Sequence, residues 1–209
     1  ELIRYGHISK NKRWVIYTTT TTIKQINNYP KIKAHLDRFK KITTSDNKPY
    51  GLHRAREESF FKGEKIISLR MTKMPVFTYT DFDCYVSQTY FVIKPNKDEL
   101  SLKYLTALLN SKLFYFWFYH RGKRKGEQLQ IDKEPLLRVP IKKISASAQQ
   151  PFINHIDHIL SIIGENDYLA NTDKQAKVFA LERQMDEMVY KLYGLTPEEI
   201  EIVEQSISK

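Results

Sequence analysis

The feature that most limits how this chain can fold is the stretch from Ser101 to His120, SLKYLTALLNSKLFYFWFYH. Apolar residues recur in it with the spacing of one helix face, at Leu102, Leu105, Leu109, Leu113 and Trp117. The opposite face is also rich in apolar side chains, and a helix that is apolar nearly all round is buried on several sides. Polar interruptions such as Lys103 and Asn110 make it unsuited to span a bilayer. We therefore expect one buried helix over 101–120, capped by Ser101, at the centre of the fold.

A cationic segment follows this helix directly, Arg121-Gly122-Lys123-Arg124-Lys125-Gly126. Its two glycines loosen the backbone, so we expect a flexible loop that the rigid helix presents to an anionic partner. Residues 129–131 then predict a return strand. Residues 135–141, which begin with one proline and contain another, predict a turn and an edge strand, because proline cannot donate to a central ladder.

The chain before the buried helix predicts a small sheet. Short runs of β-branched and aromatic residues predict strands at 14–17, 65–70, 76–79, 84–86 and 89–93. The five threonines at 18–22 are also compatible with a strand. Residues 32–41 have the spacing of an amphipathic helix with a basic face, for which a solvated surface is favoured and direct phosphate contact is the alternative. The fold class that follows is α+β: a small mixed or antiparallel sheet packed on the central buried helix.

The character of the chain changes at residue 145. A possible capping box at Ser147 predicts a helix that ends at Gly164, and a second helix carries a heptad-like apolar stripe from Val178 to Leu192. Thr196, Pro197 and Glu199 predict the start of a third helix. We expect these three helices to pack on the preceding part or to form a spacer against another domain.

Charge divides the chain in the same way. Residues 1–144 hold 29 Lys+Arg against 13 Asp+Glu, whereas residues 145–209 hold 5 against 11. We therefore predict a basic α/β domain over 1–144 and an acidic helical region over 145–209. Because aromatic residues interleave the positive charge, a nucleic-acid partner is favoured over a generally basic soluble protein. No Lys-rich amphipathic helix that would favour a membrane surface stands out.

The sequence lacks the usual signatures of catalysis and of cofactor binding. It has no glycine-rich nucleotide loop, no Cys/His metal spacing and a single cysteine, Cys84. Asp81 and Asp83 fit a solvated turn better than a metal site. We expect no catalytic, metal or cofactor site in this chain, and the absence of a signal peptide and of a long apolar run predicts a cytoplasmic protein.

Three stretches taken in order resemble one family. They are residues 52–67, residues 104–113 with the basic glycine segment and Val139-Pro140-Ile141 after it, and residues 185–196. Together, from about Trp14 to Val203, the chain is similar to the TaqI-like C-terminal specificity domain, the target recognition domain of adenine-specific DNA methyltransferases and of type IIG restriction–modification enzymes.

The resemblance implies that this chain clamps duplex DNA and reads a target site. It implies a separate N-terminal methyltransferase domain that binds S-adenosylmethionine and methylates N6 of a flipped adenine, with magnesium if the protein also cleaves DNA. The first residue, Glu1, also leads us to expect a longer polypeptide.

Such domains differ at the residues that read bases, so our candidates come from side-chain chemistry. Arg suits guanine and Gln suits adenine in the major groove, and Arg54, Arg56, Arg70 and Gln88 are therefore the base-reading candidates. For Arg54 and Arg56, ion pairs with the neighbouring glutamates are an equal alternative. Phosphate contacts are assigned to Lys123, Arg124 and Lys125, and Lys73 and Arg121 are further DNA-binding candidates without an assigned role.

Three rival interpretations remain open. An RNA or single-strand binding module would stack bases on Trp14, Tyr17 and Tyr79. A helical interaction module would pair its heptad-like stripe with a partner protein. A nuclease with an unrecognised site would nick DNA in the presence of a metal.

Overall fold

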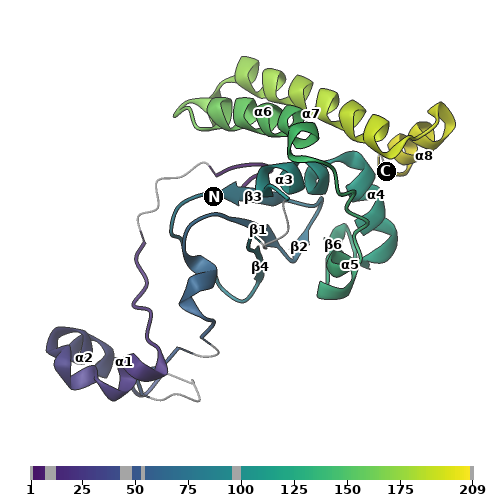
Figure 1. Ribbon diagram of the computed structural model, residues 1–209. Helices are drawn as coiled ribbons and strands as arrows, with labels where there is room; N and C mark the ends of the chain where they lie inside the picture. Colours follow the sequence, from purple (N-terminus) through teal and green to yellow (C-terminus); the bar gives the residue numbers. More distant parts are fainter. Residues whose placement is uncertain (1, 8–12, 43–48, 53–54, 96–99, 208–209) are drawn as a thin grey trace. The chain divides into compact units, whose positions relative to one another are not determined.

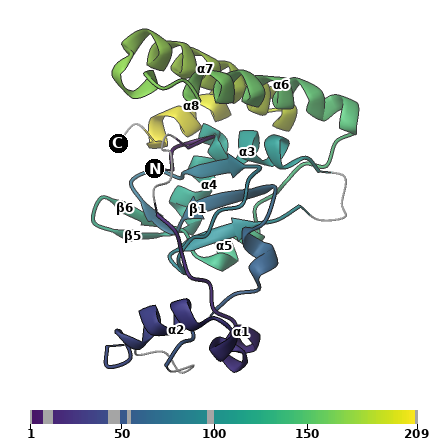
Figure 2. The ribbon, with the colours of Figure 1, turned by 90° about the vertical axis from the view of Figure 1, so that its left-hand side faces the viewer.

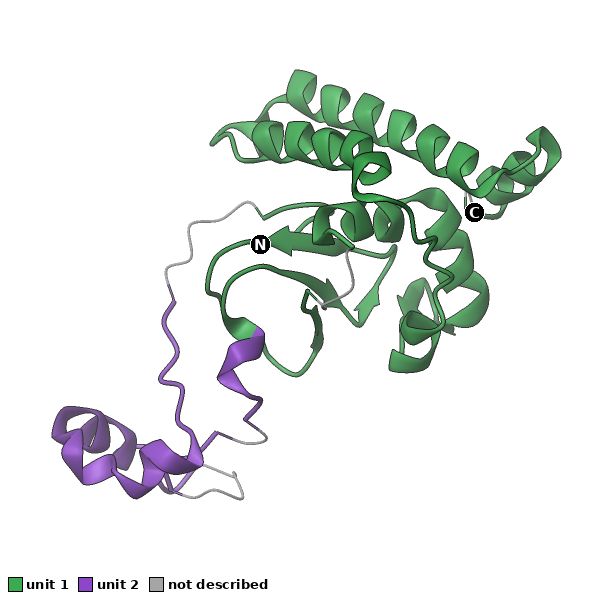
Figure 3. Cartoon of the chain, viewed as in Figure 1, with its two compact units in different colours: residues 1–10, 61–209 green, residues 11–60 purple. Residues whose placement is uncertain are grey.

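The computed structural model describes residues 2–7, 13–42, 49–52, 55–95 and 100–207 (Figure 1). The chain divides into two compact units, one of residues 1–10 with 61–209 and one of residues 11–60 (Figure 3). The division between residues 1–144 and 145–209 rests on charge and composition, and it stays a prediction.

An antiparallel sheet lies at the centre of the larger unit, with strand order β3-β1-β4. Its strands are β1 (Lys65–Leu69), β3 (Phe77–Thr80) and β4 (Tyr90–Ile93), which confirms three predicted strands. Ile66 pairs with Tyr79 on one side and with Ile93 on the other, and it is fully buried. The N-terminal residues add to this sheet, since the Tyr5 N–H donates to Phe77 O and Tyr5 O accepts from Tyr79 N–H.

Two predicted strands are not found, although the structure describes both stretches. Residues 14–17 and 84–86 belong to no strand. The Trp14 side chain is 98% exposed, and within the described ranges no strand pairs with residues 14–17. The Cys84 N–H donates to Phe61 O at 3.0 Å, which is a loop contact rather than a ladder. β-propensity without a partner strand is not enough to form a strand.

The predicted single helix over 101–120 is two helices, α3 (Leu102–Asn110) and α4 (Lys112–Arg121). Ser101 caps α3 as predicted, by accepting from the Lys103 N–H. Ser111 breaks the helix with ψ of 158° and caps α4 by accepting from the Phe114 N–H. The apolar pattern did not indicate this break, because it continues through both helices. The predicted burial holds for α3, whereas in α4 only Phe114 and Phe118 are fully buried.

Tertiary contacts explain the position of the break. The Asn110 amide donates to Phe77 O at 2.7 Å and accepts from the Phe77 N–H at 3.0 Å, so it pairs with the edge of β3. The Asp186 carboxylate accepts from the Lys112 N–H at 2.8 Å at the start of α4. The Asp186 contact satisfies an N–H that the start of α4 would otherwise leave unpaired, and the Asn110 contact ties the end of α3 to the backbone of β3.

Three helices cover the body, as predicted for residues 145–209. They are α6 (Ala146–Ile163), α7 (Thr172–Tyr193) and α8 (Pro197–Ile207), with a 3-10 turn η3 (Tyr168–Ala170) before α7. In Figure 2, α6 and α7 lie on the side of α3 that faces away from the sheet, and α6 contacts α3. The predicted cap at Ser147 is wrong: Ser145, two residues earlier, caps α6 by accepting from the Ala148 N–H.

The predicted ends of the later helices are confirmed. Gly194 follows α7 with φ of 71°, the left-handed conformation that favours glycine. Thr196 and Glu199 form a reciprocal capping box, with the Thr196 N–H donating to the Glu199 carboxylate at 2.8 Å. No helix in the described ranges has the length and apolarity needed to cross a membrane.

A second sheet has the strand order β2-β6-β5. Its strands are β2 (Met71–Thr72), β5 (Lys123–Lys125) and β6 (Gln128–Gln130), and the return strand predicted at 129–131 is confirmed. The predicted edge strand at 135–141 is wrong, because residues Lys133–Leu137 form the short helix α5. Pro135 lies in its first turn, where no N–H donor is needed.

The smaller unit consists of short helices. These are α1 (Thr20–Lys24), the 3-10 turn η1 (Ile26–Asn28) and α2 (Pro30–Asp37), while the 3-10 turn η2 (Glu58–Phe61) leads out of the unit. The helix predicted at 32–41 is confirmed but ends at Asp37. The strand-compatible threonines are instead the start of a helix, because the Thr19 hydroxyl accepts from the Thr22 N–H and caps α1.

Candidate nucleic-acid interface

The predicted flexible basic loop is an antiparallel hairpin of β5 and β6. Lys125 pairs with Gln128 across a two-residue turn, Gly126-Glu127. Gly126 has φ of 60°, as the first position of a type II′ turn requires. Gly122 lies between α4 and the hairpin. A Cβ at this position would lie 2.6 Å from Phe118 O, so only glycine lets the strand pass this close to the end of α4. The three cations of β5 are all exposed, and the strand holds them on a defined backbone.

Asp132 organises the base of this hairpin. Its carboxylate accepts from the Gln130 amide at 2.8 Å and pairs with Lys123 at 3.0 Å and with Arg70 at 3.2 Å. The hydrogen bond from Gln130, followed by those from Lys123 and Arg70, lowers the pKa of Asp132 to about 2. Asp132 therefore stays ionised and fixes two candidate cations side by side, while it neutralises part of their charge.

Arg70 lies between the two sheets of the larger unit. Its N–H donates to Thr89 O beside β4, and its carbonyl accepts from the Ile131 N–H beside β6. The guanidinium lies 5.3 Å from the centre of the Phe91 ring. Gln88 is exposed in the turn just before β4, next to Thr89. The structure thus brings Arg70 and Gln88 into one region near the hairpin.

Aromatic residues of α4 support two further candidates. The Arg124 guanidinium lies 4.6 Å from the centre of the Tyr119 ring, and the Arg121 guanidinium lies 5.3 Å from that of Trp117. Trp117 is fixed in turn by donating its ring N–H to Pro135 O at 3.2 Å. Stacked guanidinium groups lose less freedom when they bind a phosphate or a base.

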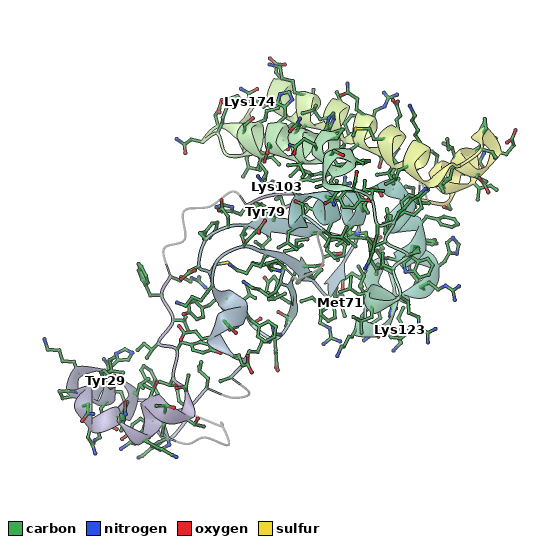
Figure 4. The ribbon with its side chains drawn as sticks, in the orientation of Figure 1. Tyr29, Met71, Tyr79, Lys103, Lys123 and Lys174 are labelled. Carbon is green, nitrogen blue, oxygen red and sulfur yellow. The ribbon has the colours of Figure 1, made fainter. Side chains whose placement is uncertain are left out.

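Lys73 follows β2 and completes the cationic group. Its ammonium pairs with Glu127 in the hairpin turn at 2.8 Å, and both side chains are largely exposed. An exposed pair of this kind contributes little to stability and separates readily when a phosphate competes. Met71 of β2 and Lys123 of β5 lie near each other in Figure 4, on the two outer strands of this sheet.

The remaining two candidates are not placed with this group. Arg54 lies outside the described residues. Arg56 belongs to the smaller unit, where it is half-buried and its carbonyl accepts from the Tyr17 hydroxyl. The structure thus groups Arg70, Lys73, Gln88, Arg121, Lys123, Arg124 and Lys125.

Sequence reasoning missed the residues that position these cations. Asp132, Gln130 and Tyr119 each hold a candidate side chain or its partner, yet none of them has a distinctive motif. One signal was available: Asp132 and Glu127 are the only two acidic residues between His120 and Lys133. Single carboxylates inside a basic run are good candidates for fixing its geometry.

The acidic helices leave the hairpin uncovered. In Figure 2, β5 and β6 project to one side of the larger unit, away from α6 and α7, and in Figure 1 β6 lies below α4. The ion pairs that fasten the helices use other cations, namely Arg4 with Glu182, Lys103 with Asp157 and Lys112 with Glu204. Within the described ranges, no ion pair joins residues 121–130 to residues 146–207.

The aromatic residues considered for base stacking differ in exposure. Tyr79 is only 9% exposed, its hydroxyl donates to Glu64 at 3.0 Å, and Lys103 lies over its ring (Figure 4). Tyr17 is half-buried, whereas Trp14 is fully exposed. Tyr79 is therefore not available to stack a base.

A cationic hairpin, braced by an aromatic helix and clear of the acidic helices, defines a module that binds a polyanion. Comparison with known proteins makes this class specific. Residues 22–141 match the family model of the TaqI-like C-terminal specificity domain, which is more than half of the chain, and the chain belongs to that family. The resemblance predicted from the sequence is thereby confirmed over 22–141, whereas the stretch at 185–196 lies outside the match.

Two curated relatives are similar over the same length. The type II methyltransferases M.HincII of Haemophilus influenzae and M.HindII of its strain Rd are each 29% identical over 121 residues. The matched part is 54% of this chain and 24% and 23% of the respective relatives. This chain therefore matches only about a quarter of the length of these curated relatives.

Proposed function

We propose that this chain recognises a specific sequence in duplex DNA on behalf of a restriction–modification methyltransferase. The observation that carries the proposal is the exposed β5–β6 hairpin, whose cations are fixed by Asp132 and by the rings of α4 in a chain of the specificity-domain family. A two-stranded ribbon of this kind fits the major groove of B-DNA. The similarity to relatives named as type II methyltransferases supports a role within a methyltransferase.

Within the site, phosphate contact and base reading fall to different residues. Lys73, Arg121, Arg124 and Lys125 carry exposed charge at the edge of the hairpin and suit the DNA backbone. Arg70 and Gln88 lie at the ends of β1 and β4, and Arg70 is held by Asp132, so both suit base edges. Lys123 shares Asp132 with Arg70 and contributes less net charge. Arg54 and Arg56 remain base-reading candidates by residue type alone.

The catalytic part of the whole protein is proposed to lie in a separate methyltransferase domain. That domain would bind S-adenosylmethionine and methylate N6 of adenine, and magnesium would be needed if the protein also cleaves DNA. Among the described residues, no group of three His, Cys, Asp or Glu side chains is arranged to hold a metal ion. We propose that the protein works in the cytoplasm, where its DNA substrate is found.

Selection from a pool of randomised duplexes tests this function and yields the target sequence in the same experiment. The chain is mixed with the pool, bound duplexes are recovered and sequenced, and the cycle is repeated. We expect one short motif to be enriched, and Arg70→Ala or Gln88→Ala to relax it at a single base position, at a cost of about 1–3 kcal/mol. Duplex binding without any enriched motif would mean that the chain binds DNA without sequence specificity, which would refute the proposed recognition of a target site.

Competition with other ligands separates the rival interpretations. Stronger binding to single-stranded DNA or RNA than to duplex would favour a stacking module built on exposed aromatics such as Trp14. Metal-dependent nicking by the purified chain would point to a nuclease. Tight binding of a partner protein by a chain with no affinity for DNA would favour the helical interaction module.

A further inference from the structure

The positive charge of this protein is concentrated in its smaller unit. Residues 11–60 hold 11 Lys+Arg against 4 Asp+Glu, a net charge of +7 on 50 residues. The larger unit holds 23 against 20, a net charge of +3 on 159 residues (Figure 3). The hairpin therefore lies on a unit that is nearly balanced overall, while most of the net charge lies elsewhere.

The smaller unit has little core to oppose this self-repulsion. Among its described residues, the only buried ones are Thr18, Ile26 and Gly51. Polar contacts hold it together instead: the Thr18 hydroxyl donates to Tyr50 O at 2.7 Å, and the Tyr50 hydroxyl donates to Asp37 at 2.8 Å. A small, highly charged unit with so little buried apolar surface is stabilised when a polyanion neutralises it.

One face of α2 is already neutralised. Asp37 pairs with Lys40 at 2.7 Å and with Lys33 at 3.4 Å, and it accepts from Tyr50. The hydrogen bond from Lys40, followed by those from Tyr50 and Lys33, lowers the pKa of Asp37 to about 2, so the carboxylate stays charged. Lys33 and Lys40 are thus compensated within the unit.

The opposite face of α2 carries two cations, Lys31 and Arg38, without such compensation. Lys31, His35 and Arg38 follow one another at i, i+4 and i+7, the spacing that places side chains on one helix face. Arg38 caps the helix in α-helical geometry, so it continues this row. Lys31 and Arg38 are exposed, and among the described residues neither has an ion pair. We call Lys31, His35 and Arg38 the α2 stripe.

We propose that the α2 stripe is a second surface for the phosphate backbone of duplex DNA, independent of base sequence. This proposal rests on the proposed function, because it takes duplex DNA as the polyanion that the chain binds. Phosphate contact suits the stripe, since Lys31 and Arg38 place two long cationic side chains on one face of a short helix and supply charge that needs no particular base. Two separate cationic surfaces would let one unit add affinity while the other reads the sequence.

The salt dependence of binding tests the stripe in the full chain. We compare wild type with Lys31→Gln/Arg38→Gln by titrating a labelled duplex of random sequence at salt concentrations from about 50 to 200 mM. Each lost phosphate contact flattens the slope of log K against log[salt] by about 0.9, so two lower it by about 1.8. Over this fourfold range, the wild type then loses about 12-fold more affinity than the variant.

A matched control removes the same charges from another helix. Lys177 and Arg183 are exposed on α7, and Lys177→Gln/Arg183→Gln changes the net charge equally. We expect this control to keep the wild-type slope. An equal flattening in both variants would mean that total charge rather than the stripe matters, and it would overturn the inference.

Hydrogen exchange on the wild type gives a second readout that needs no variant. With random duplex added, we expect slower amide exchange in peptides covering residues 20–38. No protection there, together with an unchanged slope for Lys31→Gln/Arg38→Gln, would refute the stripe while leaving hairpin binding in place. No duplex binding by the wild type at any salt concentration would refute the proposed function itself.

Discussion

Neutralising the hairpin is the most direct perturbation of the proposed interface. In the variant Lys123→Gln/Arg124→Gln/Lys125→Gln, Lys125 loses an exposed charge and Arg124 a guanidinium held over Tyr119. Lys123 already pairs with Asp132 at 3.0 Å, so its loss counts for less than a full contact. The slope of log K against log[salt] should therefore flatten by between about 1.8 and 2.7. Over a fourfold salt range, the wild type should lose about 10- to 40-fold more affinity than the variant.

Fluorescence anisotropy of a labelled duplex across a salt series measures this slope. The control variant Lys177→Gln/Arg183→Gln/Lys191→Gln removes three exposed charges from α7, away from the hairpin. It should retain the wild-type slope, and both variants should keep the circular dichroism of the wild type. If the hairpin variant binds specific and random duplexes with unchanged affinity and slope, the hairpin has no part in binding.

Three further predictions follow from single residues. Asp132→Asn releases Arg70 and Lys123, so binding to random duplex should tighten at low salt and the slope should steepen by about 0.9; weaker binding in the same titration would mean that Asp132 serves only to position them. Burial raises the pKa of Asp186 from 3.8 to about 6, so the native state binds a proton more readily than the unfolded chain. Relative to Asp186→Asn, wild-type stability should fall as pH rises from about 4 to 6, by up to roughly 3 kcal/mol at about 1.4 kcal/mol per pKa unit, and a constant difference between the two proteins in urea titrations across this range would exclude this. Ser111→Ala removes the cap of α4 and should cost about 1 kcal/mol in urea unfolding, whereas an unchanged midpoint would mean that the Ser111 hydroxyl does not stabilise the helix.

The sequence predicted the elements whose signals are local. The cap at Ser101, the left-handed Gly194 and the box of Thr196 with Glu199 all lie where sequence reasoning placed them. Each depends on groups only a few residues apart, so the short-range pattern contains the whole interaction. The three strands of the central sheet were also predicted, because their β-branched and aromatic residues coincide with positions that have a pairing partner.

The candidate site was predicted in composition but not in shape. The cations of residues 121–125 were identified from charge, yet the flexible loop expected there is a hairpin, whose strand β6 pairs with β2 about 60 residues earlier in the chain. Arg70 was chosen by residue type, and its position between two sheets depends on hydrogen bonds to Thr89 and Ile131. A local sequence pattern cannot indicate hydrogen bonds between residues this far apart in the chain.

Local sequence was enough to indicate a basic region over residues 1–144, three acidic helices over 145–209, the apolar stretch at 101–120 and the helix ends at Ser101, Gly164, Gly194 and Thr196. The break at Ser111 came only with the folded chain, because Asn110 binds the edge of β3 and Asp186 caps the next helix from α7. Folding also settled which cations Asp132 neutralises, namely Arg70 and Lys123. Both outcomes have one cause: a hydrogen bond or ion pair between partners far apart in the chain forms only where the rest of the fold brings them within reach.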